Sequence, residues 1–131
     1  MGEFRLSTTP TPHAEGSMAV RLGTGDGCVG FTGDTGPDQA LGPFFSGCQL
    51  LLAECSHPED KKIESHLTPE GLAALAQIAA PELLVTLHCY PALDPEKVPS
   101  LLAEAGYEGR VLTGWDGLSL DLTDGHVREL A

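Results

Sequence analysis

The segment from Cys28 to Gly36 reads CVGFTGDTG and joins an apolar run to a tight, glycine-flanked loop. Residues 18–22 (MAVRL) precede it across the turn-forming insert GTGDG, so residues 18–22 and 28–32 predict a β-hairpin. Asp34 follows the second strand, where small neighbours leave its carboxylate facing open space. Such a carboxylate is a ligand for Zn²⁺, Mn²⁺ or Fe²⁺. The alternative is a turn aspartate that accepts hydrogen bonds from its own backbone.

The chain around this segment alternates between predicted strands and helices. Residues 48–55 (CQLLLAEC) and 83–88 (LLVTLH) are apolar runs typical of strands covered on both faces. Helices are predicted from Thr68 to Pro81 and from Asp94 to Gly106, each opening with a capping side chain and a proline. The other expected elements are an extended run over 4–11, a short helix over 37–46 starting at Pro37, and a final strand pair, 110–114 and 118–122. This order indicates an α/β fold.

Length and charge limit the classes of function. The 131 residues fit one domain, 1–131. Seven Lys and Arg against 19 Asp and Glu give a net charge of −12, which argues against nucleic acid as the main partner. No apolar run approaches the ~20 residues of a membrane span, and no signal-peptide pattern is present. The four cysteines form no C-x-x-C pair, which favours buried free thiols and a cytoplasmic location.

Two histidines lie where strands end. His88 closes the run LLVTLH, at the carboxyl end of a buried strand, where α/β folds bind their ligands. His13 follows Thr-Pro-Thr-Pro, whose prolines stiffen its approach. The competing interpretations are a hydrogen-bonded histidine at the edge of the core and an ordinary loop histidine.

Glu54 and His66 form a possible acid–base pair. Glu54 ends the apolar run 48–55, where a carboxylate is costly unless it is paired or reaches a site. His66 lies just before the helix cap Thr68. Together they would suit proton transfer, unless they are only a helix-end histidine beside a salt-bridged acid. The other two histidines, His57 and His126, are interpreted as surface residues.

The ordered set of these residues resembles the metallo-β-lactamase-fold hydrolases, most closely the ribonuclease Z and phosphodiesterase branch, over roughly residues 5–122. The resemblance implies that His13 binds one metal, that Asp34 in FTGDTG bridges two metals, and that His88 in VTLHCYP binds the second. It also implies that Glu54 in LAECS and His66 in HLTPE are catalytic, with His66 in proton transfer or in contact with the scissile group. The histidine that precedes the family's glutamate is absent, since Ala53 stands there.

The family's H-x-H-x-D-H motif is missing, because no two histidines here are separated by one residue. The resemblance therefore implies only the C-terminal half of an αββα sandwich: a mixed sheet with helices on one face and an incomplete dinuclear site for Zn²⁺, Mn²⁺ or Fe²⁺. The chain would be a fragment, one product of a split gene or a natural half-fold. Alone it would be a weak or inactive hydrolase.

A half sandwich leaves one sheet face bare, and covering several hundred Å² of apolar surface at ~25 cal/mol per Å² is worth several kcal/mol. We therefore expect a partner, either the missing N-terminal half or a second copy of the chain in a homodimer. In the complete enzyme, the acidic balance favours a small anionic phosphodiester or an ester as substrate. The alternative function is a non-catalytic assembly or dimerisation module.

Overall fold

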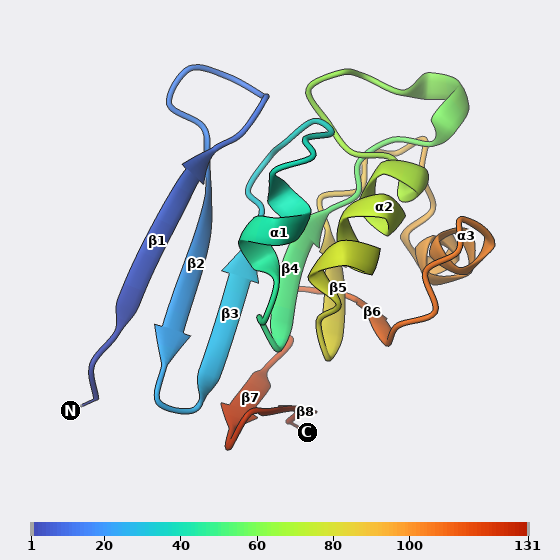
Figure 1. Ribbon diagram of the computed structural model, residues 1–131. Helices are drawn as coiled ribbons and strands as arrows, with labels where there is room; N and C mark the ends of the chain where they lie inside the picture. The colour runs from blue at the N-terminus through green and yellow to red at the C-terminus, as the bar shows by residue number, and fades with distance from the viewer. Residues whose placement is uncertain (1, 131) are drawn as a thin grey trace.

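The computed structural model describes residues 2–130 and contains one six-stranded mixed sheet, three α-helices and a separate hairpin (Figure 1). The strands are β1 Arg5–Pro10, β2 Met18–Thr24, β3 Gly27–Phe31, β4 Leu50–Glu54, β5 Leu83–Leu87, β6 Val111–Thr113, β7 Leu120–Thr123 and β8 His126–Glu129. The helices are α1 Leu41–Phe45, α2 Pro69–Ala79 and α3 Val98–Glu104, with 3₁₀ turns η1 Glu59–Lys61 and η2 Pro95–Lys97. Within residues 2–130, no helix is both long and apolar enough to cross a membrane.

The sheet follows chain order from β1 to β6. β1, β2 and β3 pair antiparallel, as the predicted hairpin requires, and β3 to β6 pair parallel. Each parallel connection passes through a helix or helical turn, and all three α-helices pack on the same face of the sheet (Figure 1). The predicted α/β class, with a mixed sheet and helices on one face, is confirmed.

Local signals explain where the helices begin. The Thr68 hydroxyl accepts the Gly71 N–H at 3.2 Å, and α2 starts at Pro69 as predicted. The prediction that the first helix starts at Pro37 is wrong. The Asp38 carboxylate accepts the Ala40 N–H at 2.8 Å and forms a turn, so α1 begins only at Leu41.

The predicted final strand pair is also wrong. Residues 111–113 form β6, which pairs parallel with β5 and not with the segment that follows it. The next strand, β7, instead pairs antiparallel with β8, which was not predicted. β7 and β8 leave the main sheet after the turn at Trp115–Gly117, so β6 is the last strand of the six-stranded sheet.

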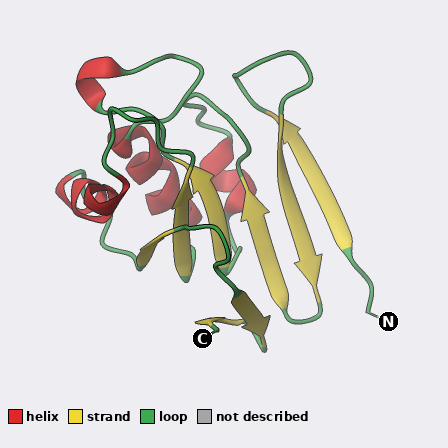
Figure 2. Ribbon diagram, turned by 180° about the vertical axis from the view of Figure 1, so that it is seen from behind, coloured by secondary structure: helices red, strands yellow, loops and turns green. Residues whose placement is uncertain are grey.

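The β7–β8 hairpin packs against the sheet face opposite the helices (Figure 2). Its Leu120, Leu122 and Val127 join Leu50 and Val85 in a second, smaller apolar cluster. The expectation of a bare sheet face is therefore corrected in part, since the hairpin covers the β4–β5 region. The same face of β1, β2 and β3 keeps exposed apolar side chains, namely Leu6 (65% exposed), Met18 (51%) and Phe31 (45%).

Candidate metal centre

All five predicted site residues lie at one edge of the sheet, where the parallel strands end. His13 lies in the loop after β1, Asp34 follows β3, Glu54 is the last residue of β4, and His88 follows β5. His66 precedes the cap of α2. Because neighbouring parallel strands end at the same edge, the topology brings these distant residues together.

The Asp34 carboxylate lies between two imidazoles. Its Oδ2 is 3.7 Å from Nε2 of His13, and its Oδ1 is 3.5 Å from Nδ1 of His88. Both separations are too long for a good hydrogen bond. Among residues 2–130 no hydrogen bond to this carboxylate is found, and the side chain is 43% exposed. The carboxylate and the two imidazoles thus lie close together, but no good hydrogen bond joins the carboxylate to either ring.

The orientation of His13 is set by the backbone. Its Nδ1 lies 2.9 Å from the carbonyl oxygen of Ser65. A carbonyl can only accept a hydrogen bond, so Nδ1 carries a proton, and Nε2, which holds the lone pair in the neutral ring, lies toward Asp34. Fixing one nitrogen of a histidine on a carbonyl to free the other is the usual arrangement of a metal ligand.

His88 is held in an unusual backbone conformation. Its φ is +60°, in the left-handed region that only a few per cent of non-glycine residues occupy, mostly Asn, Asp and His. Such a conformation costs of order 1–3 kcal/mol and persists where the surroundings impose it. It turns the His88 ring at the end of β5 toward Asp34 and toward Ser56, whose Oγ lies 3.2 Å from Nδ1.

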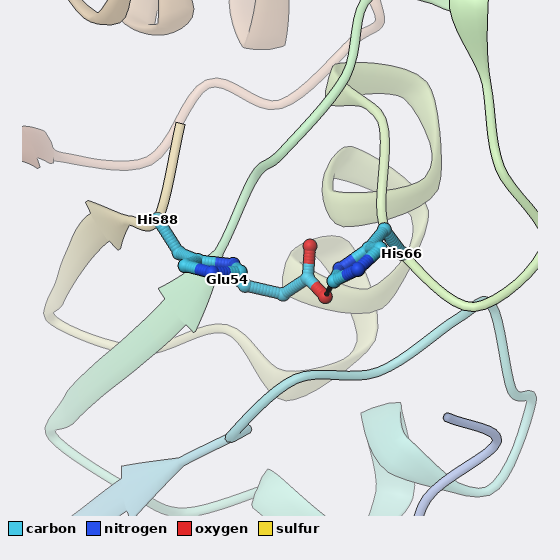
Figure 3. Close-up of side chains that lie close together, drawn as sticks. All are labelled: Glu54, His66 and His88. Carbon is cyan, nitrogen blue, oxygen red and sulfur yellow. Dashed lines mark hydrogen bonds and ion pairs between the residues drawn. The ribbon is translucent and has the colours of Figure 1, made fainter. Parts of the chain in front are cut away.

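Glu54 is buried, 2% exposed, and its two oxygens receive four polar groups. Oε1 accepts the Thr35 N–H at 2.8 Å and lies 2.8 Å from Nδ1 of His66. Oε2 accepts the Ser56 hydroxyl at 2.6 Å and the Leu67 N–H at 3.0 Å. The predicted pairing of Glu54 with His66 is present in the structure, as the dashed line in Figure 3 shows.

Two sets of three donors compete for the role of metal site. Glu54, His66 and His88 offer donor atoms that all lie within 4.8 Å of one another (Figure 3). In that set, however, the Glu54 oxygens are already engaged by four neighbouring polar groups, which leaves them no free lone pair for a cation. The set of His13, Asp34 and His88 has a carboxylate without hydrogen-bond donors and a histidine whose free nitrogen faces it. The Asp34 carboxylate of the second set is therefore less engaged in hydrogen bonds than the Glu54 carboxylate of the first, which holds His66.

The chemistry of this set fits a divalent cation. Two imidazoles and one carboxylate are ligands that Zn²⁺, Mn²⁺ and Fe²⁺ accept. The Asp34 carboxylate lies 3.7 and 3.5 Å from the two nitrogen atoms, too far for a good hydrogen bond, and is only 43% exposed. A cation among the three groups would supply the missing partner.

The sequence interpretation missed three neighbours of the site. Ser56 links Glu54 to His88 through its hydroxyl. The prediction that His57 is a surface residue is wrong, since its ring is buried and stacks on Tyr90 with centroids 4.6 Å apart. Only the position of Ser56 and His57 two and three residues after Glu54 could have pointed to them. His126 is exposed, as predicted, and its Nδ1 lies 3.4 Å from a Glu82 oxygen.

No protein-family model matches the sequence, and no curated protein matches it. Several solved structures do resemble the fold. The metallo-β-lactamase fold protein YhfI from Bacillus subtilis is similar with a TM-score of 0.78 and 20% identity, over 96% of this chain and 48% of that chain. Igni18, a metallo hydrolase from Ignicoccus hospitalis, is similar with a TM-score of 0.65 and 15% identity, over 98% and 53%. A long form RNase Z from yeast has a TM-score of 0.65 and 15% identity, over 95% and 17%.

These likenesses show the fold. The chain spans about half the length of the first two structures and lies almost wholly inside the matched region. The expected resemblance to metallo-β-lactamase-fold proteins is confirmed at this level. The chain therefore has the architecture of half a metallo-β-lactamase fold.

Proposed function

We propose that this chain forms the metal-binding part of a metal-dependent hydrolase that cleaves phosphodiesters or esters. The observation that carries the proposal is the Asp34 carboxylate lying between His13 and His88 without a hydrogen-bond donor of its own. The likeness to proteins described as metallo-β-lactamase fold and metallo hydrolase supports it. The domain 1–131 would be the C-terminal half of the complete fold.

The roles divide between binding and proton transfer. His13, Asp34 and His88 would hold Zn²⁺, Mn²⁺ or Fe²⁺. When bound, such a cation supplies Lewis-acid polarisation of the scissile group and an activated water. Glu54 holds the His66 ring through Nδ1, and the ring centroid of His66 lies 4.8 Å from that of His13. These contacts support the proposal that His66 would give a proton to the leaving oxygen.

A pocket of about 560 Å³ lies beside His66, and His13, Asp34 and His88 are not among the residues that line it. The residues that line it include one lysine, Lys62, and three acids, Glu59, Glu64 and Glu70. Three acids against one base do not favour a long polyanion. We therefore propose a small phosphodiester or an ester, and not RNA, as the substrate.

The test is hydrolysis of bis(4-nitrophenyl) phosphate and 4-nitrophenyl acetate by the chain loaded with Zn²⁺ or Mn²⁺. We expect slow release of nitrophenolate that EDTA abolishes. His66→Ala should lower this rate by about 100-fold, because a positioned general acid contributes at least that much. His126→Ala, which removes an exposed histidine, is the matched control, and circular dichroism checks that both variants are folded. A rate no higher than that of the free metal ion would contradict catalysis by this chain.

We also propose that the exposed sheet face is covered by a polypeptide segment that supplies the other half of the fold. Leu6 and Phe31 lie opposite Leu22 and Val20 of β2, so they share one face, and side-chain alternation along β2 places Met18 there too. Ala19, which points the other way, is buried in the helix-side core. The similar structures YhfI and Igni18 are about twice as long as this chain, which supports a complementary half as the occupant.

Sedimentation velocity combined with dye binding tests this partner. We expect a monomer that binds the apolar dye ANS, because the face has no cover, and we expect Phe31→Asp to reduce that binding several-fold. Ile78→Asp is the matched control, since Ile78 is 56% exposed against 45% for Phe31 but belongs to α2, on the helix side. A dimer that dissociates in Phe31→Asp would assign the face to a second copy of the chain. A monomer without dye binding would contradict both partners.

The alternative function, a non-catalytic assembly module, is favoured by the same exposed face. It needs the fold and the partner but no cation. A chain that binds its complementary half and takes up no Zn²⁺ or Mn²⁺ would support this alternative and exclude the hydrolase.

A further inference from the structure

We propose that Cys28 and Cys48 are a site of reversible modification, at which exchange with a small anionic disulfide such as oxidised glutathione closes an intrachain disulfide. The site lies at the end of the sheet opposite Asp34, because Cys28 is near the start of β3 and Cys48 precedes β4. It does not depend on the proposed hydrolase activity.

The two sulfur atoms lie 2.8 Å apart. A disulfide needs about 2.05 Å, so the sulfurs have to move together by less than about 1 Å. The backbone on both sides is already fixed, since the Gln49 N–H donates to the Cys28 carbonyl at 3.0 Å and the Cys28 N–H donates to Oε1 of Gln49 at 2.7 Å. The bond can therefore close without rearrangement of the two strands.

Both cysteines are buried, but Cys28, 7% exposed, borders an open groove. Cys28 lines a groove of about 760 Å³ formed by the start of β1 and the β2–β3 turn. The same groove is lined by Arg5 and Arg21, with Glu3 as the only acid among its lining residues. In a chain of net charge −12, the two arginines of this groove would attract an anionic disulfide.

Arg21 also ties the groove to the segment that carries Cys48. Its guanidinium donates to the carbonyl oxygens of Phe44 and Ser46 at 2.7 and 2.8 Å. Burial, and after it the neighbouring Cys28, raises the pKa of Cys48 to about 12, against a smaller lowering by Arg21. Cys48 is thus protonated at neutral pH, and we assign the first attack to Cys28, which faces the groove.

The exchange balances in two steps. The Cys28 thiolate attacks one sulfur of the reagent, whose S–S bond breaks, and the released thiolate takes up the proton that Cys28 gave up. The Cys48 sulfur then attacks the mixed disulfide at Cys28, loses its proton, and releases the second reagent thiol. Two electrons and two protons pass from the protein to the reagent, and one intrachain S–S bond forms.

The new bond would join two cysteines that are 20 positions apart in the chain. The segment between them includes α1 and the loop that carries Asp34. A crosslink of this length restricts the unfolded chain. We expect the melting temperature to rise by about 10 °C on oxidation and to return on reduction with dithiothreitol.

The test is incubation of the whole chain in glutathione buffers of graded redox ratio, followed by alkylation, peptide mapping and thermal melting. We expect a linked peptide that contains residues 28 and 48, and a mass lower by two hydrogens. Cys48→Ala should stop at a stable glutathione adduct on Cys28, while Cys89→Ala, at the half-buried cysteine, should still form the link. A link between Cys55 and Cys89, an adduct on Cys89 alone, or no reaction at Cys28 in any of these chains would overturn the proposal.

Discussion

Replacing Asp34 by alanine is expected to lower the affinity of the chain for Zn²⁺ by about 100-fold or more. The reason is that Asp34 supplies the only carboxylate in its donor set, and its neighbours His13 and His88 are oriented toward it. Loss of an outer neighbour of a metal site already costs about 10–100-fold, so loss of a direct ligand should cost at least the upper value. His88→Ala should have a similar effect, and the double variant should show no binding in titration calorimetry.

The controls for this experiment are two residues of the same types outside the site. Asp116→Ala changes an exposed aspartate in the turn after β6, and His126→Ala changes an exposed histidine of β8. Both should bind Zn²⁺ as the parent chain does. If Asp34→Ala also bound the ion as tightly as the parent, the proposed centre would have no carboxylate ligand and the hydrolase function would lose its basis.

Several parts of the fold were predictable because their signals are local. The cap and proline at Thr68–Pro69 fix the start of α2, and the turn GTGDG fixes the β2–β3 hairpin. The β7–β8 hairpin was missed because its position depends on a distant choice, namely that β6 pairs with β5. The pattern of apolar and polar residues in a strand does not identify the remote strand with which it pairs.

The candidate site divides in the same way. The positions of Asp34 and His88 after strands were readable from the sequence, since strand ends in an α/β fold meet at one edge. The four hydrogen bonds that Glu54 accepts could not be read from the sequence. Two of them come from the backbone N–H groups of Thr35 and Leu67, whose direction depends on the folded loops. The positive φ of His88 likewise has no signal in the sequence.

Replacing Glu54 by alanine is expected to lower the free energy of unfolding by about 4 kcal/mol, because the change leaves four buried or half-buried hydrogen-bond donors without their acceptor. These are the N–H groups of Thr35 and Leu67, the hydroxyl of Ser56 and Nδ1 of His66. Such a loss approaches the total stability of many domains of this size. Urea denaturation followed by circular dichroism measures it, and Glu104→Ala on the exposed side of α3 should change stability by less than about 0.5 kcal/mol.

Glu54→Gln separates the two possible roles of this carboxylate. It keeps the shape of the side chain and one acceptor oxygen, so it should cost less stability than Glu54→Ala, about 2 kcal/mol. If Glu54 positions His66, the folded Glu54→Gln chain keeps its Zn²⁺ affinity to within about 10-fold, the lower value for an indirect neighbour, while Asp34→Ala loses about 100-fold or more. Equal losses of affinity in the two variants would instead make Glu54 a ligand and favour the set of Glu54, His66 and His88. The comparison matters because the Glu54 carboxylate already accepts four hydrogen bonds, whereas no hydrogen-bond donor among residues 2–130 is found for the Asp34 carboxylate.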